Sequence, residues 1–171
     1  MLLHFRFQSL AMGLLVLFST AVAMAAGGSS GGSSGSGSAA RVEAGDESDP
    51  VIKAAREKIA REDWPGTQEL LRNALQTQPR NPDYHNLLAF STRKGPSPDM
   101  ALVFAEYAEA LRLDPKHRGA REYLGEAYLQ VGDLPKAKEQ LAALDKLCFF
   151  PCEEYSDLLK LVRQYEASHP Q

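Results

Sequence analysis

Cysteine and net charge are both scarce in this chain, and each scarcity excludes a class of protein. Only two cysteines occur among 171 residues, so neither a disulfide-rich scaffold nor a four-ligand zinc site can be assembled. The 19 basic and 22 acidic side chains nearly cancel, to a net charge of -3. That balance gives no electrostatic reason to expect nucleic acid or an anionic membrane as the main ligand.

Catalytic motifs are absent as well. The predicted fold has no glycine-rich phosphate loop and no G-x-S-x-G turn, because the Gly/Ser run of residues 27–40 lies outside that fold and precedes no helix directly. His85 and His117 do not stand in a metal or triad spacing, and His117 is expected to be a solvated turn residue. We therefore predict no enzyme, no cofactor and no metal site.

One long apolar run is present, within residues 1–26. A short start containing Arg6 precedes it, and small residues follow it in two overlapping A-x-A patterns, as in a secretory signal peptide. An uncleaved anchor is the alternative, but the run falls short of the ~20 apolar residues that a spanning helix needs. We expect a cleaved signal, no membrane insertion afterwards, and a periplasmic or secreted protein.

Glycine, serine and alanine fill residues 27–40 and leave almost no side chain to bury. We predict a disordered linker over 27–47, because such a segment stays a flexible coil. It is either a tether or an unselected leader.

Apolar residues recur at helical spacing after Asp49, and proline and glycine interrupt them at regular intervals. Paired helices of about a dozen residues that repeat every ~34 residues are typical of a solenoid of α-hairpins. The fold class is therefore predicted to be all-α. The predicted helices span about 50–61, 64–77, 82–93, 98–113, 118–130, 134–147 and 152–167.

The clearest repeat resembles the tetratricopeptide-repeat (TPR) motif. Its residues at the motif's spacing are Leu124, Gly125, Tyr128, Ala137 and Leu141. Small residues at 125 and 137 are expected where two antiparallel helices approach closely. The resemblance implies a TPR domain over 48–167, with repeats at about 48–81, 82–117 and 118–150 and a cap helix at 152–167. The whole chain is similar to small exported bacterial three-TPR proteins ending in C-x3-C-E-E-Y.

The other two repeats depart from the motif. The turn of the second repeat, around residues 93–98, is two residues longer than usual, and in the first repeat Lys58 and Thr67 replace the tyrosine and the alanine. In the cap helix, Glu153 and Glu154 are expected to face water and to complement the helix dipole. The predicted apolar stripe of that helix is Tyr155, Leu158, Leu159 and Val162.

Cys148 and Cys152 stand four positions apart, just before the cap helix. In an exported protein a disulfide is permitted, and this spacing can satisfy its Cα separation. We expect the bond to set the angle at which the cap helix leaves the third repeat. The alternative is a thiol-redox or metal-handling accessory protein, since paired thiolates suit a soft cation.

In TPR arrays the first helix of each repeat lines a concave groove that contacts ligands. Carried over to this chain, the resemblance implies an adaptor that binds a protein or peptide segment, with Phe90 as an exposed apolar anchor. The alternative is that Phe90 packs between repeats. Reversal of Arg93 to Glu is expected to weaken partner capture without unfolding the protein. The implied partner-binding residues are Ile52, Arg56, Ile59, Asn86, Phe90, Arg93, Glu122, Glu126 and Gln130. They predict a groove of mixed charge, with the two arginines toward one end and the two glutamates toward the other.

Overall fold

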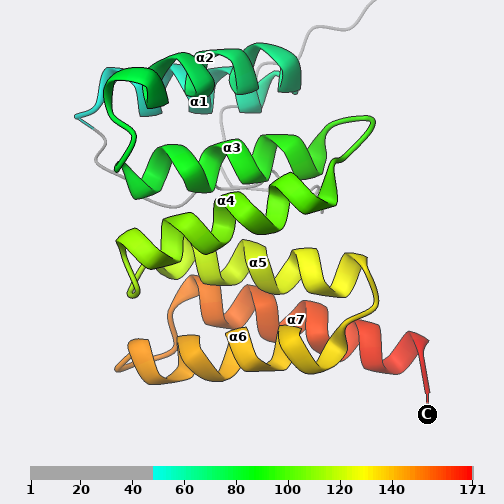
Figure 1. The fold of residues 1–171 in the computed structure, drawn as a ribbon. Helices are drawn as coiled ribbons and strands as arrows, with labels where there is room; N and C mark the ends of the chain where they lie inside the picture. The colour runs from blue at the N-terminus through cyan, green and yellow to red at the C-terminus, as the bar shows by residue number, and fades with distance from the viewer. Residues whose placement is uncertain (1–47, 171) are drawn as a thin grey trace, which may run out of the picture. The chain divides into compact units, whose positions relative to one another are not determined.

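The structure is a computed structural model that describes residues 48–170, so the predicted signal peptide and linker lie outside the described residues. The described part contains seven α-helices and no strand, which confirms the all-α prediction (Figure 1). The predicted boundaries agree with the observed ones to within two residues. The helices are α1 Pro50–Ala60, α2 Trp64–Thr77, α3 Pro82–Lys94, α4 Met100–Leu113, α5 Arg118–Gln130, α6 Leu134–Leu147 and α7 Glu153–Ser168.

Side-chain caps determine where most of these helices begin. At α1, for example, Asp49 accepts the backbone N–H of Val51 at 2.8 Å, and Asn81 accepts that of Asp83 at 3.0 Å before α3. Such a cap contributes about 1 kcal/mol to helix stability. The capping residues of α1 to α6 are Asp49, Asp63, Asn81, Asp99, His117 and Asp133.

The first and third hairpins share one turn geometry. The backbone N–H of Asp63 bonds to the carbonyl of Lys58 at 2.9 Å, and the N–H of Asp133 bonds to that of Tyr128 at 2.8 Å. The residue before each aspartate has a positive φ, 56° at Glu62 and 82° at Gly132. The two turns lie 70 positions apart, which is two repeats of about 35 residues. The second hairpin has the longer connection, as predicted, with five residues between α3 and α4 against three in each of the others.

Consecutive hairpins pack side by side along the described part of the chain. Each first helix contacts the next one, α1 with α3, α3 with α5 and α5 with α7, and each second helix contacts the following first helix (Figure 1). Helix α3 lies in the middle of this stack, and every residue from Asn86 to Arg93 is buried. A repeat of this kind buries its apolar face only against its neighbours. The buried apolar residues accordingly form two clusters, one from α1 to α5 and one from α6 and α7, and half-buried Tyr128 packs against both.

The last helix is attached through a close backbone approach. A Cβ built on Gly125 of α5 would lie 2.5 Å from Leu158 Cδ2 of α7. The small residue at 125 therefore admits the next helix, whereas we expected it to serve contact within its own hairpin. Leu158 and Val162 of the predicted apolar stripe are buried with Ala137 and Leu144 of α6.

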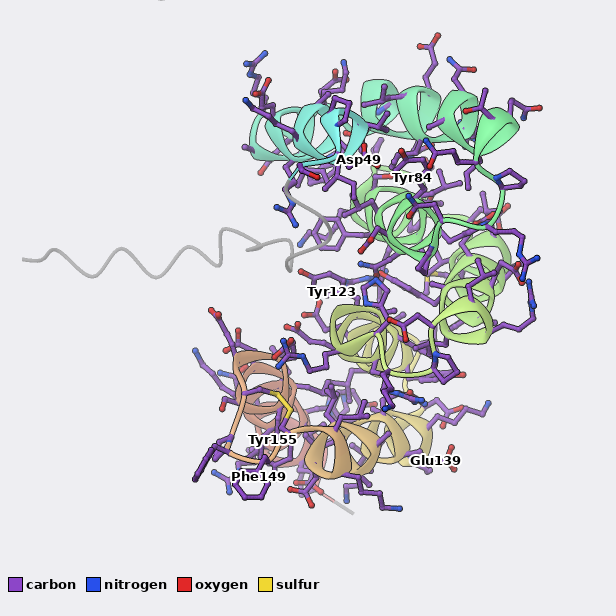
Figure 2. The ribbon with its side chains drawn as sticks, turned by 90° about the vertical axis from the view of Figure 1, so that its left-hand side faces the viewer. Asp49, Tyr84, Tyr123, Glu139, Phe149 and Tyr155 are labelled. Carbon is purple, nitrogen blue, oxygen red and sulfur yellow. A yellow bond between two sulfur atoms is a disulfide. The ribbon has the colours of Figure 1, made fainter. Side chains whose placement is uncertain are left out.

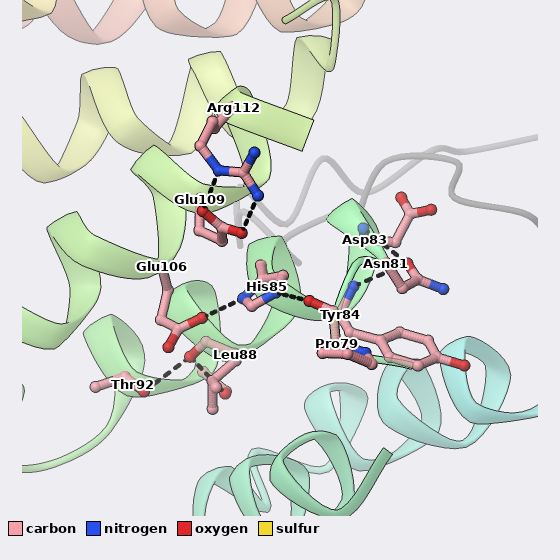
Figure 3. Close-up of polar contacts among 11 residues, drawn as sticks. Pro79, Asn81, Asp83, Tyr84, His85, Leu88, Thr92, Glu106, Glu109 and Arg112 are labelled. Carbon is pink, nitrogen blue, oxygen red and sulfur yellow. Dashed lines mark hydrogen bonds and ion pairs between the residues drawn. The ribbon is translucent and has the colours of Figure 1, made fainter. Parts of the chain in front are cut away.

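Polar contacts also join neighbouring helices (Figure 3). His85 of α3 places Nδ1 2.5 Å from Glu106 of α4 and Nε2 2.9 Å from the carbonyl of Pro79. His117 caps α5 through Nδ1 and lies 3.3 Å from Asp83, with a side chain only 10% exposed. The expectation of a solvated turn histidine at 117 is wrong, because this turn packs against α3.

Over residues 48–170, every helix is too short or too polar to traverse a lipid bilayer.

Candidate functional site

Three of the nine predicted partner-binding residues meet at one pocket, which we call the α3–α5–α7 pocket. Arg93 comes from α3, and Glu126 and Gln130 come from α5. The pocket has a volume of about 320 Å³, and the surface that lines it is largely apolar. Its remaining lining residues are Leu129 of α5 and Leu161, Gln164, Tyr165 and Ser168 of α7.

Sequence reasoning missed the contribution of α7. We interpreted residues 152–167 as a cap with a polar outer face, but one side of α7 forms a wall of the pocket. Its lining residues recur at positions 161, 164, 165 and 168, the spacing of one face of a helix. That spacing is the signal that could have identified α7 as the first helix of a further unit.

A buried ion pair forms part of the pocket lining. Arg93 Nη2 lies 2.7 Å from Glu126 Oε2, and their side chains are 6% and 22% exposed. Burial disfavours the charged guanidinium, but Tyr107 and Glu126 outweigh this effect and raise the pKa of Arg93. Burial also raises the pKa of the Tyr107 hydroxyl to about 12, partly opposed by Arg93. Arg93 therefore keeps its positive charge inside the protein at neutral pH.

The predicted charge distribution of the groove needs correction. We expected arginines toward one end and glutamates toward the other, yet Arg93 and Glu126 are paired with each other. Glu122 is also buried, at 6% exposure. Charge reversal at Arg93 would place two carboxylates together in a buried site, so the expectation that this variant stays fully folded does not hold.

Phe90 is not an exposed anchor. It is 1% exposed, and its ring lies 4.9 Å from Tyr123 of α5 and 6.3 Å from Trp64 of α2. The alternative that Phe90 packs between repeats is correct, and Trp64 is the packing residue that accompanies it.

Several other predicted positions are also buried, because the first helices contact one another. Ile52, Ile59 and Asn86 are each at most 5% exposed, while Arg56 is half-buried. Gln130, at the end of α5, is exposed.

The two cysteines form the predicted disulfide, with Cα atoms 5.7 Å apart. It joins the C-cap of α6 to the N-cap of α7. Glu154 does not face water: it is 2% exposed and lies 2.9 Å from Arg118. A Glu154 oxygen and both sulfurs fall within 4.8 Å of one another, but sulfurs bonded to each other offer no thiolate to a metal. The metal-handling alternative therefore requires a reduced chain.

Comparison with known proteins shows a likeness in structure and none in sequence. No family model matches the chain, and no curated protein matches its sequence. Among solved structures, the chain is similar to the type III secretion translocator chaperone SycD of Yersinia enterocolitica, with a TM-score of 0.60 and 13% sequence identity. The match covers 69% of this chain and 82% of SycD. At this identity the likeness shows the fold, an all-helical stack of hairpins.

Proposed function

We propose that this chain is an exported TPR-type adaptor that binds a segment of another protein in the α3–α5–α7 pocket. The observation that carries the proposal is the pocket itself, in which three first helices, distant in sequence, contribute to one largely apolar hollow. Concave apolar sites with a few convergent polar groups are the usual form of a binding site.

The lining favours an uncharged segment with a bulky apolar side chain. Leu129, Leu161 and Tyr165 supply apolar surface, while Gln130 and Gln164 offer amide groups to a bound backbone. The two charged groups of the lining are paired with each other, so neither is available as a primary clamp for a terminal carboxylate. An engineered apolar cavity of about 150 Å³ binds benzene, and a pocket of about 320 Å³ is large enough for the biggest side chains.

The sequence supports the TPR assignment and the export. Leu124, Gly125, Ala137 and the shared turn geometry follow the repeat register, and residues 1–26 have the plan of a signal peptide. SycD is described as a chaperone, a role that requires a protein partner, and we extend only the binding of a protein segment to this chain. A periplasmic or secreted location is part of this proposal.

Site-specific photo-crosslinking tests the proposal. A photoreactive phenylalanine analogue at Gln164, which is exposed and lines the pocket, is expected to give a discrete adduct with the partner in cells. The matched control is the same analogue at Glu139 of α6, which is exposed and is not among the residues that line the pocket. Figure 2 shows Glu139 at the opposite edge of this part of the chain from Tyr155 and Phe149 of the α7 side. Equal adducts at both positions, or adducts at Glu139 alone, would contradict binding at the pocket.

A further inference from the structure

Two phenylalanines lie exposed to solvent just before α7. Phe149 and Phe150 are 94% and 76% exposed, and between residues 48 and 170 the other exposed large apolar side chain is Val131, at 49%. The two rings lie edge to face with centroids 4.9 Å apart. The disulfide closes the loop that carries them, so the pair is presented in a restricted conformation (Figure 2). Exposed apolar groups with this degree of preorganisation are typical of a contact surface.

We propose that the Phe149–Phe150 pair docks into the α3–α5–α7 pocket of a second copy of this chain. The two copies form a two-fold dimer in which the α7 helices run antiparallel, and each copy contributes its aromatic pair to the pocket of the other. The proposal goes beyond the adaptor function, because the phenylalanine pair of the second copy occupies the pocket and a segment of a partner protein would have to displace it.

The placement of pair and pocket along α7 favours this symmetry. The aromatic pair precedes the first residue of α7, and the pocket is lined by residues 161–168 in the second half of the helix. The 16 residues of α7 span about 24 Å, so the pair cannot fill the pocket of its own chain as this helix is folded. An antiparallel neighbour reverses the order and brings each aromatic loop to the other copy's pocket. A reciprocal contact of this kind closes as a dimer.

Charge along α7 fits the same register. Glu153, Asp157, Lys160 and Gln164 are exposed and recur at intervals of four, three and four residues, along one face of the helix. With the two-fold axis midway between positions 158 and 159, Asp157 of each copy lies opposite Lys160 of the other. The same register places Glu153 opposite Gln164. Opposite charges thus meet twice across the axis, and no like charges of these four residues meet.

Size and area are also consistent with a dimer. A cavity of about 150 Å³ accommodates one benzene ring, so a pocket of about 320 Å³ matches two rings. A buried aromatic side chain covers roughly 150–250 Å², so the four phenylalanines of the dimer supply about 600–1,000 Å². The antiparallel α7 face adds to this area, and stable interfaces begin at about 1,200 Å².

Light scattering, which measures the mass of the particle in solution, tests the proposal. The sample is the full chain in the form purified from the cells that produce it. We expect twice the chain mass at micromolar concentration, and at least a hundredfold weaker association after combined Phe149→Ser and Phe150→Ser. The control, Val131→Ser, removes an exposed apolar side chain from the α5–α6 turn and is expected to leave the mass unchanged. A monomeric wild-type chain would overturn the proposal, and so would a dimer that is indifferent to the phenylalanine changes.

A charge exchange tests the register independently of folding. Asp157→Lys alone and Lys160→Asp alone each place like charges across the axis, and each is expected to weaken the dimer about tenfold. The combined exchange restores opposite charges and is expected to restore the dimer affinity. Equal dimer affinities for the two single variants and the combined variant would overturn the antiparallel register. Phenylalanine-dependent sedimentation with neutral phospholipid vesicles, by a chain that stays monomeric, would assign the pair to lipid instead. Partner crosslinking at Gln164 in a monomeric chain would retain the adaptor function and reject only the dimer.

Discussion

Gly125→Ala is predicted to have opposite effects on stability in two backgrounds. In the wild-type chain the new methyl group would lie 2.5 Å from Leu158 Cδ2 and 2.8 Å from Cδ1. Carbon atoms in favourable contact are about 3.5–4.0 Å apart, so Leu158 must move by about 1 Å. Leu158 is 0% exposed and has no solvent to move into. Such overpacking costs about 1–3 kcal/mol.

Helix propensity acts in the other direction. Alanine in a helix interior is more favourable than glycine by about 1 kcal/mol. The net expectation for Gly125→Ala in the wild-type chain is a loss of about 1 kcal/mol of the free energy of unfolding. In a Leu158→Ala background the clash is absent, so the same substitution is expected to gain about 1 kcal/mol. Leu158→Ala alone is expected to cost about 2–5 kcal/mol because it leaves a cavity between α5, α6 and α7.

Urea unfolding followed by helical circular dichroism, on all four members of the double-mutant cycle, measures this coupling. Gly95→Ala is the matched control, because a Cβ at Gly95 would meet no heavy atom closer than 3.4 Å. That variant is expected to change stability by less than about 0.5 kcal/mol. The same sign for Gly125→Ala in both backgrounds would refute the close approach of α7 to Gly125.

Three further predictions concern charge, backbone and pH. Arg93→Glu is expected to lower the free energy of unfolding by about 3–5 kcal/mol, and adding Glu126→Arg is expected to restore most of that loss. Urea unfolding measures both variants, and a double variant no more stable than Arg93→Glu would contradict the pair. Glu62→Gly is expected to stabilise the chain by up to ~1 kcal/mol and Gly132→Ala to destabilise it by about 1–2 kcal/mol, since both residues have positive φ; thermal melts that show the reverse order would contradict this. The raised pKa of Tyr107 contributes stability that is fully present below pH 10 and is lost as pH rises toward 12. In Tyr107→Phe the free energy of unfolding, measured by denaturation at pH 9 to 12, should therefore decrease less with pH than in the wild-type chain.

Helix positions could be predicted from the sequence because their signals are local. A cap such as Asn81 before Pro82, or Asp99 before α4, satisfies backbone groups within three residues of itself. Even the longer second turn follows from counting residues between the motif positions. The repeat register was therefore legible without knowledge of the neighbouring repeats.

The candidate site was predicted less well, because burial depends on what packs against a residue. Phe90 was predicted to contact a ligand, but Trp64 and Tyr123, 26 and 33 positions away, surround it. Glu154 looked like an exposed residue of a first helical turn, yet Arg118 lies against it from α5. In each case the deciding contact joins elements far apart in the sequence, which a single-sequence pattern does not encode.

The attachment of α7 links the stability of the fold to the candidate site. Leu158 anchors the helix against Gly125 of α5, the Glu154–Arg118 ion pair ties its first turn to the start of the same helix, and the disulfide joins it to α6. Together these contacts place Tyr165 and the other residues of its second half as a wall of the pocket before any ligand arrives. Preorganisation lowers the cost of binding, because fewer side chains have to be ordered at that moment. Changes that loosen α7, such as Leu158→Ala, are therefore expected to weaken binding at the pocket without altering any residue that lines it.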